Sequence, residues 1–259
     1  MYSERRKEIQ ELADTHSHVT LKELEEKYPG VSSMTLRRDL EHLERLGAVI
    51  RVKGGAVSVR QIAAQSGEDG VEPAYWTRAV QNGDAKIKIG RLACRYLDEG
   101  RSVYIDAGTT AMSMAQQLPP MRLSVFTSGP NIALELINRA GMAVSLVGGN
   151  LNRDNLALSG SGAQEFMADI NIDLAFMAAS GFSISGGFSC GNRSECDLKK
   201  LVISKARKVI ILMDSTKVDK TLPFTFADVS DADVLICNKP LDSALLYHVT
   251  DNGVEFICE

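Results

Sequence analysis

The chain has 259 residues, 44% of them hydrophobic, and a formal net charge of −4 at neutral pH. This length exceeds one average domain and is short for three, and the hydrophobic content is sufficient to fill a core. No apolar run approaches the roughly 18–20 residues of a membrane-spanning helix, and the charged start MYSERRKE does not resemble a signal peptide. We therefore expect a cytoplasmic protein of two parts that has no membrane partner.

The charge is unevenly distributed along the chain. Residues 33–60 hold six lysines and arginines against three acidic residues, whereas residues 61–259 hold 18 against 23. A locally basic surface on an acidic body favours a sequence-specific reader of nucleic acid. The five cysteines are scattered without a C-x-x-C pair, which predicts reduced thiols. His16 and His18, like Cys190 and Cys196, have no partners at metal-ligand spacing, so we expect no metal and no cofactor.

The N-terminal elements follow the order of a winged helix-turn-helix. A first helix begins near Ser3 and carries Ile9, Leu12 and Ala13 on one face. The run Thr20-Leu21-Lys22-Glu23 is a capping box, and it opens a short helix that continues to Tyr28. We place the helix-turn-helix itself at about residues 20–39.

The segment 31–56 carries the most specific signal. Four leucines recur at the spacing of one helix face: Leu36, Leu40, Leu43 and Leu46. Ser32 or Ser33 can cap the start of this helix, and the alternating run after Gly47 turns like a hairpin at Gly54-Gly55. A helix in a DNA groove beside a basic wing would use the polar residues of both elements. The residues that we expect to contact DNA are Ser33, Thr35, Arg37, Arg38, Arg51 and Lys53.

The same segment also fits a solvent-exposed amphipathic helix followed by an ordinary hairpin, because an Arg-Arg pair on a helix is common on protein surfaces. The sequence motif of the segment favours DNA binding over this alternative. The stretch Thr20–Ala56 resembles the DNA-binding module of the DeoR family of bacterial transcriptional regulators. That family's pattern, V-S-x-x-T-[I/L]-R-R-D-L, then L-x-x-x-G and a wing ending in G-G-A, is matched by Val31-Ser32, Thr35–Leu40, Leu43, Gly47 and Gly54–Ala56. Lys27–Gly30 is one residue longer than the family's usual turn.

The resemblance implies that operator DNA is a partner of this chain. Because one winged module reads only a half-site, it also implies a homo-oligomer, either a dimer or a tetramer.

Beyond the hairpin, the composition predicts a linker and then a second domain. Residues 59–84 lose strong periodicity and contain Gly67, Gly70 and Pro73, so we expect a DNA-binding domain at 1–58, a linker at 59–84 and an α/β domain at 85–259. Alternating short strands and helices predict a mainly parallel sheet that is covered on both faces. Strands are expected at 103–105, 123–126, 144–147, 174–178, 209–213 and 234–237, and helices at 85–97, 111–118, 132–139, 196–206 and 243–249.

Polar turns follow several of these strands, and ligands of such sheets bind at the carboxyl ends of the strands. The run Asp106–Thr110 offers a glycine, two hydroxyls and a helix N-terminus to a phosphate, although it also fits an ordinary turn with a threonine cap. Glu195 and Lys199 share a helix face at i, i+4, either in this site or as a surface ion pair. The expected effector-binding residues are Asp106, Gly108, Thr109, Thr110, Thr127, Ser128, Asn131, Gly148, Gly149, Ser180, Gly181, Glu195, Lys199, Asp214 and Lys217.

These turns also resemble the effector domain of the DeoR family, which is similar in fold to ribose 5-phosphate isomerase and binds phosphorylated sugars. The family's D-x-G-T-T, G-G, E-x-x-x-K and D-x-S/T-K landmarks fall on residues just named, whereas its T-N-S element is replaced by Thr127-Ser128-Gly129, which affects the contact expected at Asn131. The resemblance covers nearly the whole chain. It implies a transcriptional repressor of a carbohydrate catabolism operon that is induced by a sugar phosphate.

Two enzyme interpretations compete with this regulator. A domain related to sugar-phosphate isomerases could isomerise or deaminate its ligand with Asp106, Glu195 or Asp214 as the base. The run Gly187–Gly191 also matches the G-x-S-x-G pattern of serine hydrolases, but the preceding GFSISGG is too glycine-rich for the central strand that this motif needs. A covalently attached DNA reader gives ligand binding a purpose without turnover, so we predict no catalytic residues.

Overall fold

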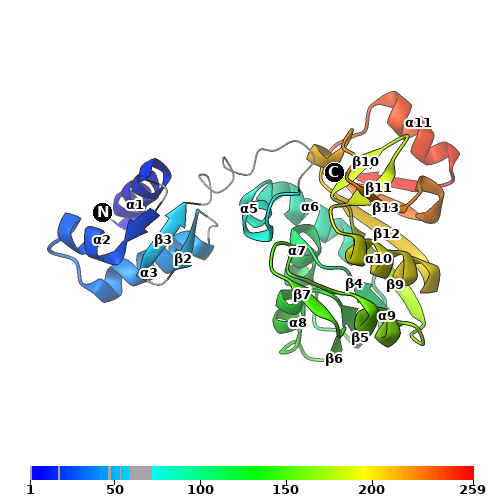
Figure 1. Ribbon diagram of the computed structural model, residues 1–259, viewed down its shortest axis with the longest axis horizontal. Helices are drawn as coiled ribbons and strands as arrows, with labels where there is room; N and C mark the ends of the chain where they lie inside the picture. The colour runs from blue at the N-terminus through cyan, green and yellow to red at the C-terminus, as the bar shows by residue number, and fades with distance from the viewer. Residues whose placement is uncertain (1, 17, 46–47, 53, 59–71) are drawn as a thin grey trace. The chain divides into compact units, whose positions relative to one another are not determined.

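The computed structural model describes residues 2–16, 18–45, 48–52, 54–58 and 72–259 (Figure 1). The chain divides into two compact units, Met1–Gln81 and Asn82–Glu259. The predicted linker at 59–84 lies outside the described residues as far as residue 71, and beyond this it contains helix α5 (Tyr75–Val80). Within the described part of the chain, none of the helices has the length and apolar character needed to cross a lipid bilayer.

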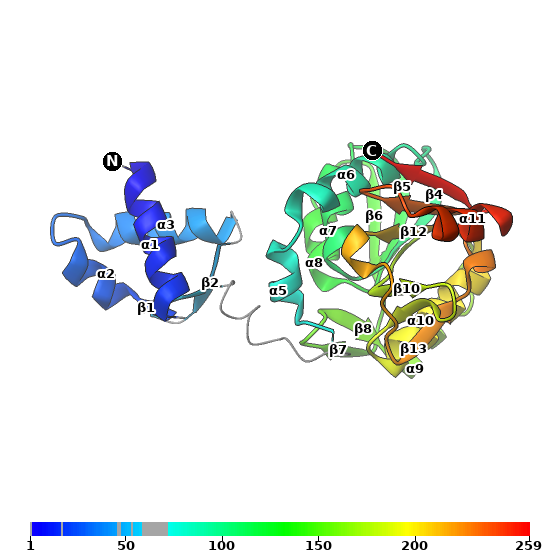
Figure 2. The ribbon, with the colours of Figure 1, turned by 90° about the horizontal axis from the view of Figure 1, so that it is seen from above.

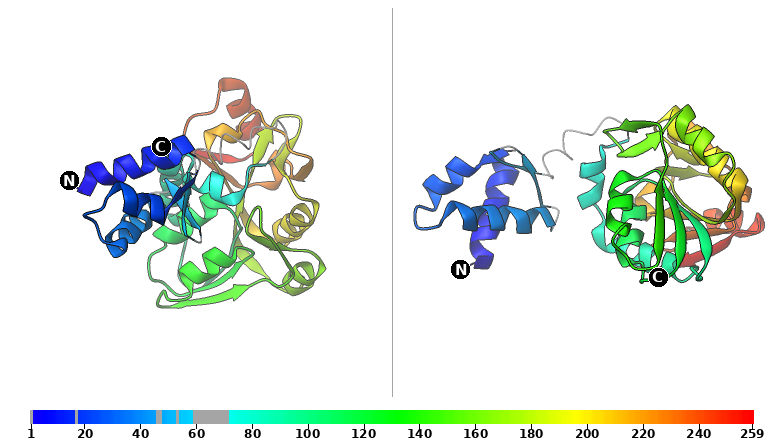
Figure 3. Two further views of the ribbon diagram at one scale, coloured as in Figure 1. Left: turned by 60° about the vertical axis from the view of Figure 1, so that its left-hand side comes forward. Right: turned by 90° about the horizontal axis from the view of Figure 1, so that it is seen from below.

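The N-terminal unit is a winged helix-turn-helix, which confirms the predicted fold. Its further elements are α1 (Tyr2–His16), β1 (His18–Thr20), α2 (Leu21–Lys27), α3 (Ser33–Arg45), β2 (Val49–Val52) and β3 (Gly55–Ser58). The strands form an antiparallel sheet in the order β1-β3-β2, in which β2 and β3 make the wing hairpin (Figure 3, blue).

Local sequence signals define the starts of the helices in this unit. The predicted capping box is formed, because Thr20 N donates to Glu23 Oε2 at 2.6 Å and Glu23 N donates to Thr20 Oγ1 at 3.1 Å. Of the two candidate serines, Ser32 caps α3 by accepting from Thr35 N at 3.3 Å. The leucine stripe of α3 is buried in a core shared with α1, α2 and the sheet, except that Leu46 lies outside the described residues.

The second unit is built on a seven-stranded parallel sheet in the order β15-β14-β12-β9-β4-β5-β6. The strands of this sheet are β4 (Arg101–Ile105), β5 (Leu123–Thr127), β6 (Met142–Leu146), β9 (Ile172–Ala178), β12 (Ala206–Met213), β14 (Val234–Cys237) and β15 (Glu255–Cys258). The helices are α6 (Gly83–Cys94), α7 (Thr109–Gln117), α8 (Pro130–Leu136), α9 (Ser161–Met167), α10 (Arg193–Lys205) and α11 (Ser243–Asp251).

Alternating side chains of the central strands build two separate cores on the two faces of this sheet. Ile105 and Phe176 pack with residues of α6, α7 and α8. Tyr104 and Ala175, one position earlier on the same strands, pack with residues of α9, α10 and α11. Figure 2 shows the two groups of helices on opposite sides of the sheet. The predicted parallel sheet with two covered faces is therefore confirmed.

The strand order places a topological switch at the centre of the sheet. From β4 the chain adds β5 and β6 towards one edge, and it then returns to add β9, β12, β14 and β15 towards the other. In open parallel sheets the crevice at such a reversal, outside the carboxyl ends of the strands, is the usual ligand site. Here it lies between the ends of β4 and β9.

Several elements were not predicted. They are the edge strand β15, helix α9, the hairpin of β7 (Asn150–Asn152) and β8 (Ala157–Ser159), and a small antiparallel sheet of β10 (Gly181–Ser183), β11 (Gly187–Cys190) and β13 (Phe224–Ala227). The G-x-S-x-G run lies in strand β11, which pairs antiparallel with β10 and β13. It is not the strand-turn-helix that a serine-hydrolase elbow requires.

Candidate DNA interface and effector site

The exposed face of α3 carries the two predicted arginines. Arg37 and Arg38 are both exposed, and neither has an ion-pair partner among the residues that the structure describes. Ser33 is exposed as well, but its Oγ donates to Glu25 Oε1 of α2 at 2.5 Å. Thr35 Oγ1 lies 3.0 Å from Ser32 Oγ, so this hydroxyl belongs to the cap of the helix.

In the wing, Arg51 is bound by carboxylates of α3. Its Nε donates to Glu44 Oε2 at 2.7 Å, and its Nη1 donates to Glu41 Oε1 at 3.1 Å. These bonds fasten the hairpin to the helix and neutralise much of the positive charge of Arg51. Lys53, the other wing residue expected to contact DNA, lies outside the described residues.

Asp39 is a structural residue beneath this surface, and its role was not predicted from the sequence. Its side chain is 1% exposed, and it accepts from Arg5 Nε and Arg6 Nε of α1, each at 2.7 Å. The two guanidinium groups thus hold α1 against the inner side of α3, while Arg37 and Arg38 point outwards. A hint was available in the sequence, since Asp39 stands three residues after Leu36, on the buried stripe.

At the centre of the second unit, the turn after β4 is organised by Asp106. Its carboxylate is buried and accepts from the backbone N–H of Ala107 at 2.9 Å and of Ala178 at 3.0 Å. The Ala107 N–H is also 3.1 Å from Ser128 Oγ, at the end of β5. Asp106 therefore joins the ends of β4 and β9 at the switch point of the sheet, and the Ala107 N–H links them to the end of β5.

Lys199 of α10 reaches the same carboxylate from the helical layer. Its ammonium contacts Asp106 Oδ2, lies 3.2 Å from Glu195 Oε1 and donates to the Ala178 carbonyl at 2.9 Å. Burial alone would lower the pKa of Lys199, but the charges of Asp106 and Glu195 outweigh it, so the pKa lies above its ordinary value. Because Lys199 is fully buried, the alternative of a surface ion pair with Glu195 is wrong.

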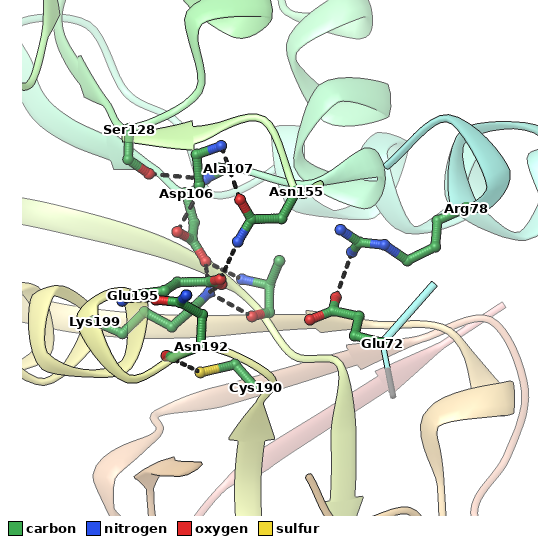
Figure 4. A network of polar contacts seen from close by, with 12 residues as sticks. Glu72, Arg78, Asp106, Ala107, Ser128, Asn155, Cys190, Asn192, Glu195 and Lys199 are labelled. Carbon is green, nitrogen blue, oxygen red and sulfur yellow. Dashed lines mark hydrogen bonds and ion pairs between the residues drawn. The ribbon is translucent and has the colours of Figure 1, made fainter. Parts of the chain in front are cut away.

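Glu195 connects this buried cluster to more accessible polar groups (Figure 4). Its Oε2 accepts from Asn155 Nδ2, in the β7–β8 hairpin, at 2.5 Å. Its backbone N–H donates to Asn192 Oδ1 at 3.1 Å, so Asn192 is the N-cap of α10. Neither asparagine was predicted. The spacing of Asn192 and Glu195 is a readable cap signal, whereas nothing local connects Asn155 to a residue 40 positions away.

The start of α7 supplies an anion-binding geometry beside Asp106. Gly108 is the N-cap residue, with φ +129°, a conformation that favours glycine, and it makes no side-chain cap. The first-turn N–H groups of a helix have no partner within the helix, so they are available to a ligand. Thr110 is buried and Thr109 is half-buried in this first turn.

The remaining predicted effector residues fall into separate places along the sheet edge. Thr127 Oγ1 accepts from Gly129 N at 3.0 Å, which shapes the turn before α8, where Asn131 is half-buried. Gly148 and Gly149 follow β6 and are exposed, and Gly149 has φ +107°.

A second set of predicted residues lies beyond β9 and β12. Ser180 N donates to the Ser189 carbonyl, and Gly181 begins the β10–β11 hairpin. Asp214 is buried after β12, where its Oδ1 accepts from Thr216 N at 3.0 Å, and the half-buried Lys217 ends the same turn. Ion pairs thus unite Asp106, Glu195 and Lys199, and Ser128 is linked to them through the Ala107 N–H, whereas the other predicted residues lie elsewhere along the carboxyl edge of the sheet.

A winged helix-turn-helix followed by an α/β domain with a polar site at its strand ends defines a regulator that couples DNA binding to ligand sensing. Residues 5–62 match the DeoR-like helix-turn-helix domain, and residues 81–239 match the DeoR C terminal sensor domain. The chain belongs to the DeoR family. It is a DNA-binding transcriptional regulator rather than an enzyme.

Relatives of similar length agree with this assignment. The HTH-type transcriptional regulator GlpR of Haloferax volcanii is 33% identical over 256 residues, which cover 98% of this chain and 97% of that protein. The HTH-type transcriptional repressor GlcR of Bacillus subtilis is 32% identical over 230 residues, which cover 88% and 85%. Among solved structures, ribose 5-phosphate isomerase A of Methanocaldococcus jannaschii matches 53% of this chain and 55% of its own with a TM-score of 0.40 at 14% identity, which is too distant to support an argument about function.

Proposed function

We propose that this regulator represses a carbohydrate catabolism operon and that a sugar phosphate, bound at the carboxyl edge of the parallel sheet, releases it from the operator. The observation that carries the proposal is the start of α7, which has no side-chain cap and adjoins the Asp106–Lys199–Glu195 cluster at the switch point. One part of the site suits an anion, and the other suits hydroxyl groups. Relatives named as repressors, such as GlcR, support the direction of regulation.

Each group of the site has a distinct role in this proposal. The N–H groups of the first turn of α7 and the hydroxyls of Thr109 and Thr110 hold the phosphate. Glu195 and Asn155 face the hydroxyl groups of the sugar. Lys199 acts as a positioning residue, because an ammonium has three donors and all three have acceptors in Asp106, Glu195 and Ala178.

On the DNA side, Arg37 and Arg38 contact base edges or phosphates, and the wing lies along the backbone. Regulators of this kind bind repeated half-sites, so the protein acts as at least a dimer. Effector and operator then compete through linkage, since an effector that binds the DNA-free arrangement more tightly shifts the population towards it.

Calorimetry with a panel of sugar phosphates and the matching unphosphorylated sugars tests the site. We expect one phosphorylated member to bind and its free sugar to bind much more weakly. Thr109→Ala and Thr110→Ala should each cost about 1.5–3 kcal/mol of binding free energy, because each removes a donor to a charged group. Thr250→Ala, on the exposed face of α11, is the matched control.

Two outcomes contradict the assignment. Unchanged effector affinity in both variants would mean that the threonines only shape the helix start. Loss of operator binding in folded variants would mean that the turn at Thr109 and Thr110 is needed for DNA binding itself and is not specific to the effector.

A further inference from the structure

The recognition helix α3 presents one large apolar side chain, that of Met34, to solvent. None of the DNA contacts proposed above involves this side chain. Met34 lies in the first turn of α3 and is 62% exposed, whereas Leu36 and Leu40 of the same helix are buried. A single exposed apolar residue is ordinary on a protein surface. The position of Met34 is nevertheless informative, because the N-terminal residues of the second helix of a helix-turn-helix contact base edges.

The neighbours of Met34 show what that face offers to DNA. Arg37 and Arg38 follow Met34 at i+3 and i+4, so the three side chains share one face of α3. The polar residues on either side of Met34 are engaged, Ser33 with Glu25 and Thr35 with Ser32. Glu41, one turn further along, is paired with Arg51 of the wing.

We propose that Met34 recognises thymine in the operator through contact between its thioether side chain and the C5-methyl group of the base. The inference rests on α3 being the helix that enters the major groove. The thymine methyl is the apolar feature that distinguishes one base pair from the others in that groove. Methionine suits it, since its flexible and polarizable side chain adapts to irregular apolar surfaces.

The geometry of the helix also places this thymine relative to the bases read by the arginines. Residues three and four positions apart are separated by about 4.5 and 6 Å along a helix axis. Base pairs are stacked about 3.4 Å apart. Arg37 and Arg38 contact guanine when they read bases, so each half-site should hold a thymine one or two steps from a guanine.

The test removes the methyl group from the DNA and the side chain from the protein. A duplex is first selected by the full-length protein from a random library, and each thymine is then replaced in turn by deoxyuridine in both half-sites. For the wild type, one thymine position should show a loss of affinity of about fourfold per half-site, the amount expected from one buried methyl group. In Met34→Ala the same replacement should have no effect.

Two controls make the result specific. Met34→Leu keeps an apolar side chain and should retain the sensitivity to deoxyuridine. Leu134→Ala shortens an exposed leucine in the second unit, 74% exposed, and should behave as the wild type. Circular dichroism verifies that each variant is folded.

The proposal is overturned if no thymine position is sensitive in the wild type, or if the sensitive positions are the same in Met34→Ala. Either result leaves the helix assignment itself to be judged separately, by the effect of removing Arg37 and Arg38 on affinity for the selected duplex.

Discussion

Two buried aspartates, Asp39 and Asp106, each hold a functional surface in place from beneath. Asp39 binds two arginines of α1, so the outer face of α3 is presented on a fixed support. Asp106 binds the backbone of two strand ends and the ammonium of Lys199. Neither carboxylate is exposed. Both therefore act by fixing the geometry of neighbouring groups.

Replacing Asp39 should destabilise the DNA-binding unit. Asp39→Asn leaves the guanidinium groups of Arg5 and Arg6 without their buried counter-ion, and the loss should be about 3 kcal/mol in the free energy of unfolding. Urea denaturation followed by circular dichroism measures it. Asp197→Asn, which removes the half-buried i, i+4 partner of the exposed Arg193, is the control and should cost less than about 1 kcal/mol. An equal effect of the two substitutions would show that Asp39 has no special role.

Removing the exposed arginines of α3 should weaken operator binding without affecting stability. Arg37→Ala or Arg38→Ala should cost about 1–3 kcal/mol at the operator, as the loss of a base or charged contact does. Arg207→Ala, a side chain 80% exposed in the second unit, serves as the control. Undiminished affinity in an Arg37→Ala/Arg38→Ala double variant, measured at fixed salt, would rule out α3 as the reading helix.

The residues that could be predicted are those with local signals. The capping box at Thr20, the leucine stripe and the glycine-threonine turn at Gly108 are all readable within a few positions of the sequence. The partners of Asp39 and of Glu195 could not be read from the local sequence, because they lie 33 to 40 residues away in the chain. Lys199 shows which property of a residue the local sequence does not predict. Its spacing from Glu195 is visible in the sequence, but its burial depends on packing between α10 and the sheet.

At the scale of elements, α10 is joined to the sheet through Lys199, which gives a prediction about pH. A group whose pKa is raised on folding contributes stability that is complete below its unfolded value, 10.5 for lysine, and is lost only at more alkaline pH. The ion cluster of the wild type therefore keeps its lysine charge throughout the neutral range. In Lys199→Met, two carboxylates lose this partner in a site of low dielectric.

Lys199→Met should accordingly lower the free energy of unfolding by about 3–5 kcal/mol at neutral pH. The difference from the wild type should shrink as the pH falls, because added protons neutralise the negative charge that the missing lysine leaves uncompensated. Thermal melts between pH 5 and pH 8 provide the measurement. Lys200→Met, at the adjacent exposed position of α10, should be nearly neutral. A pH-independent loss would indicate that packing, and not charge, explains the effect.

The elements of the parallel sheet were predictable because their apolar runs are continuous and separated by helices. The central strands and the helices α6, α7, α8, α10 and α11 all lie close to the predicted ranges. The β10–β11 hairpin could not be predicted, because its glycine-rich sequence has little strand propensity and its pairing with β13 depends on residues far along the chain. The edge strand β15 is similarly short and depends on β14 for its register.

At the scale of the whole molecule, assembly follows from the need to read two half-sites. We expect sedimentation velocity to show at least a dimer at micromolar concentration, both with and without operator DNA. The expectation does not depend on the effector. A monomer under both conditions would contradict it, and it would require each reader to bind DNA singly.

In the proposed mechanism effector and operator binding are coupled with opposite sign, and fluorescence anisotropy of a labelled operator duplex measures this coupling most directly. The sugar phosphate identified by calorimetry should lower the affinity of the wild type for the duplex, typically 5- to 150-fold. Operator DNA should lower the affinity for that sugar phosphate by the same factor, because the coupling is reciprocal. Thr110→Ala should bind the duplex normally and resist release. An operator affinity that is unchanged, or increased, when the sensor site of the wild type is saturated would contradict this coupling.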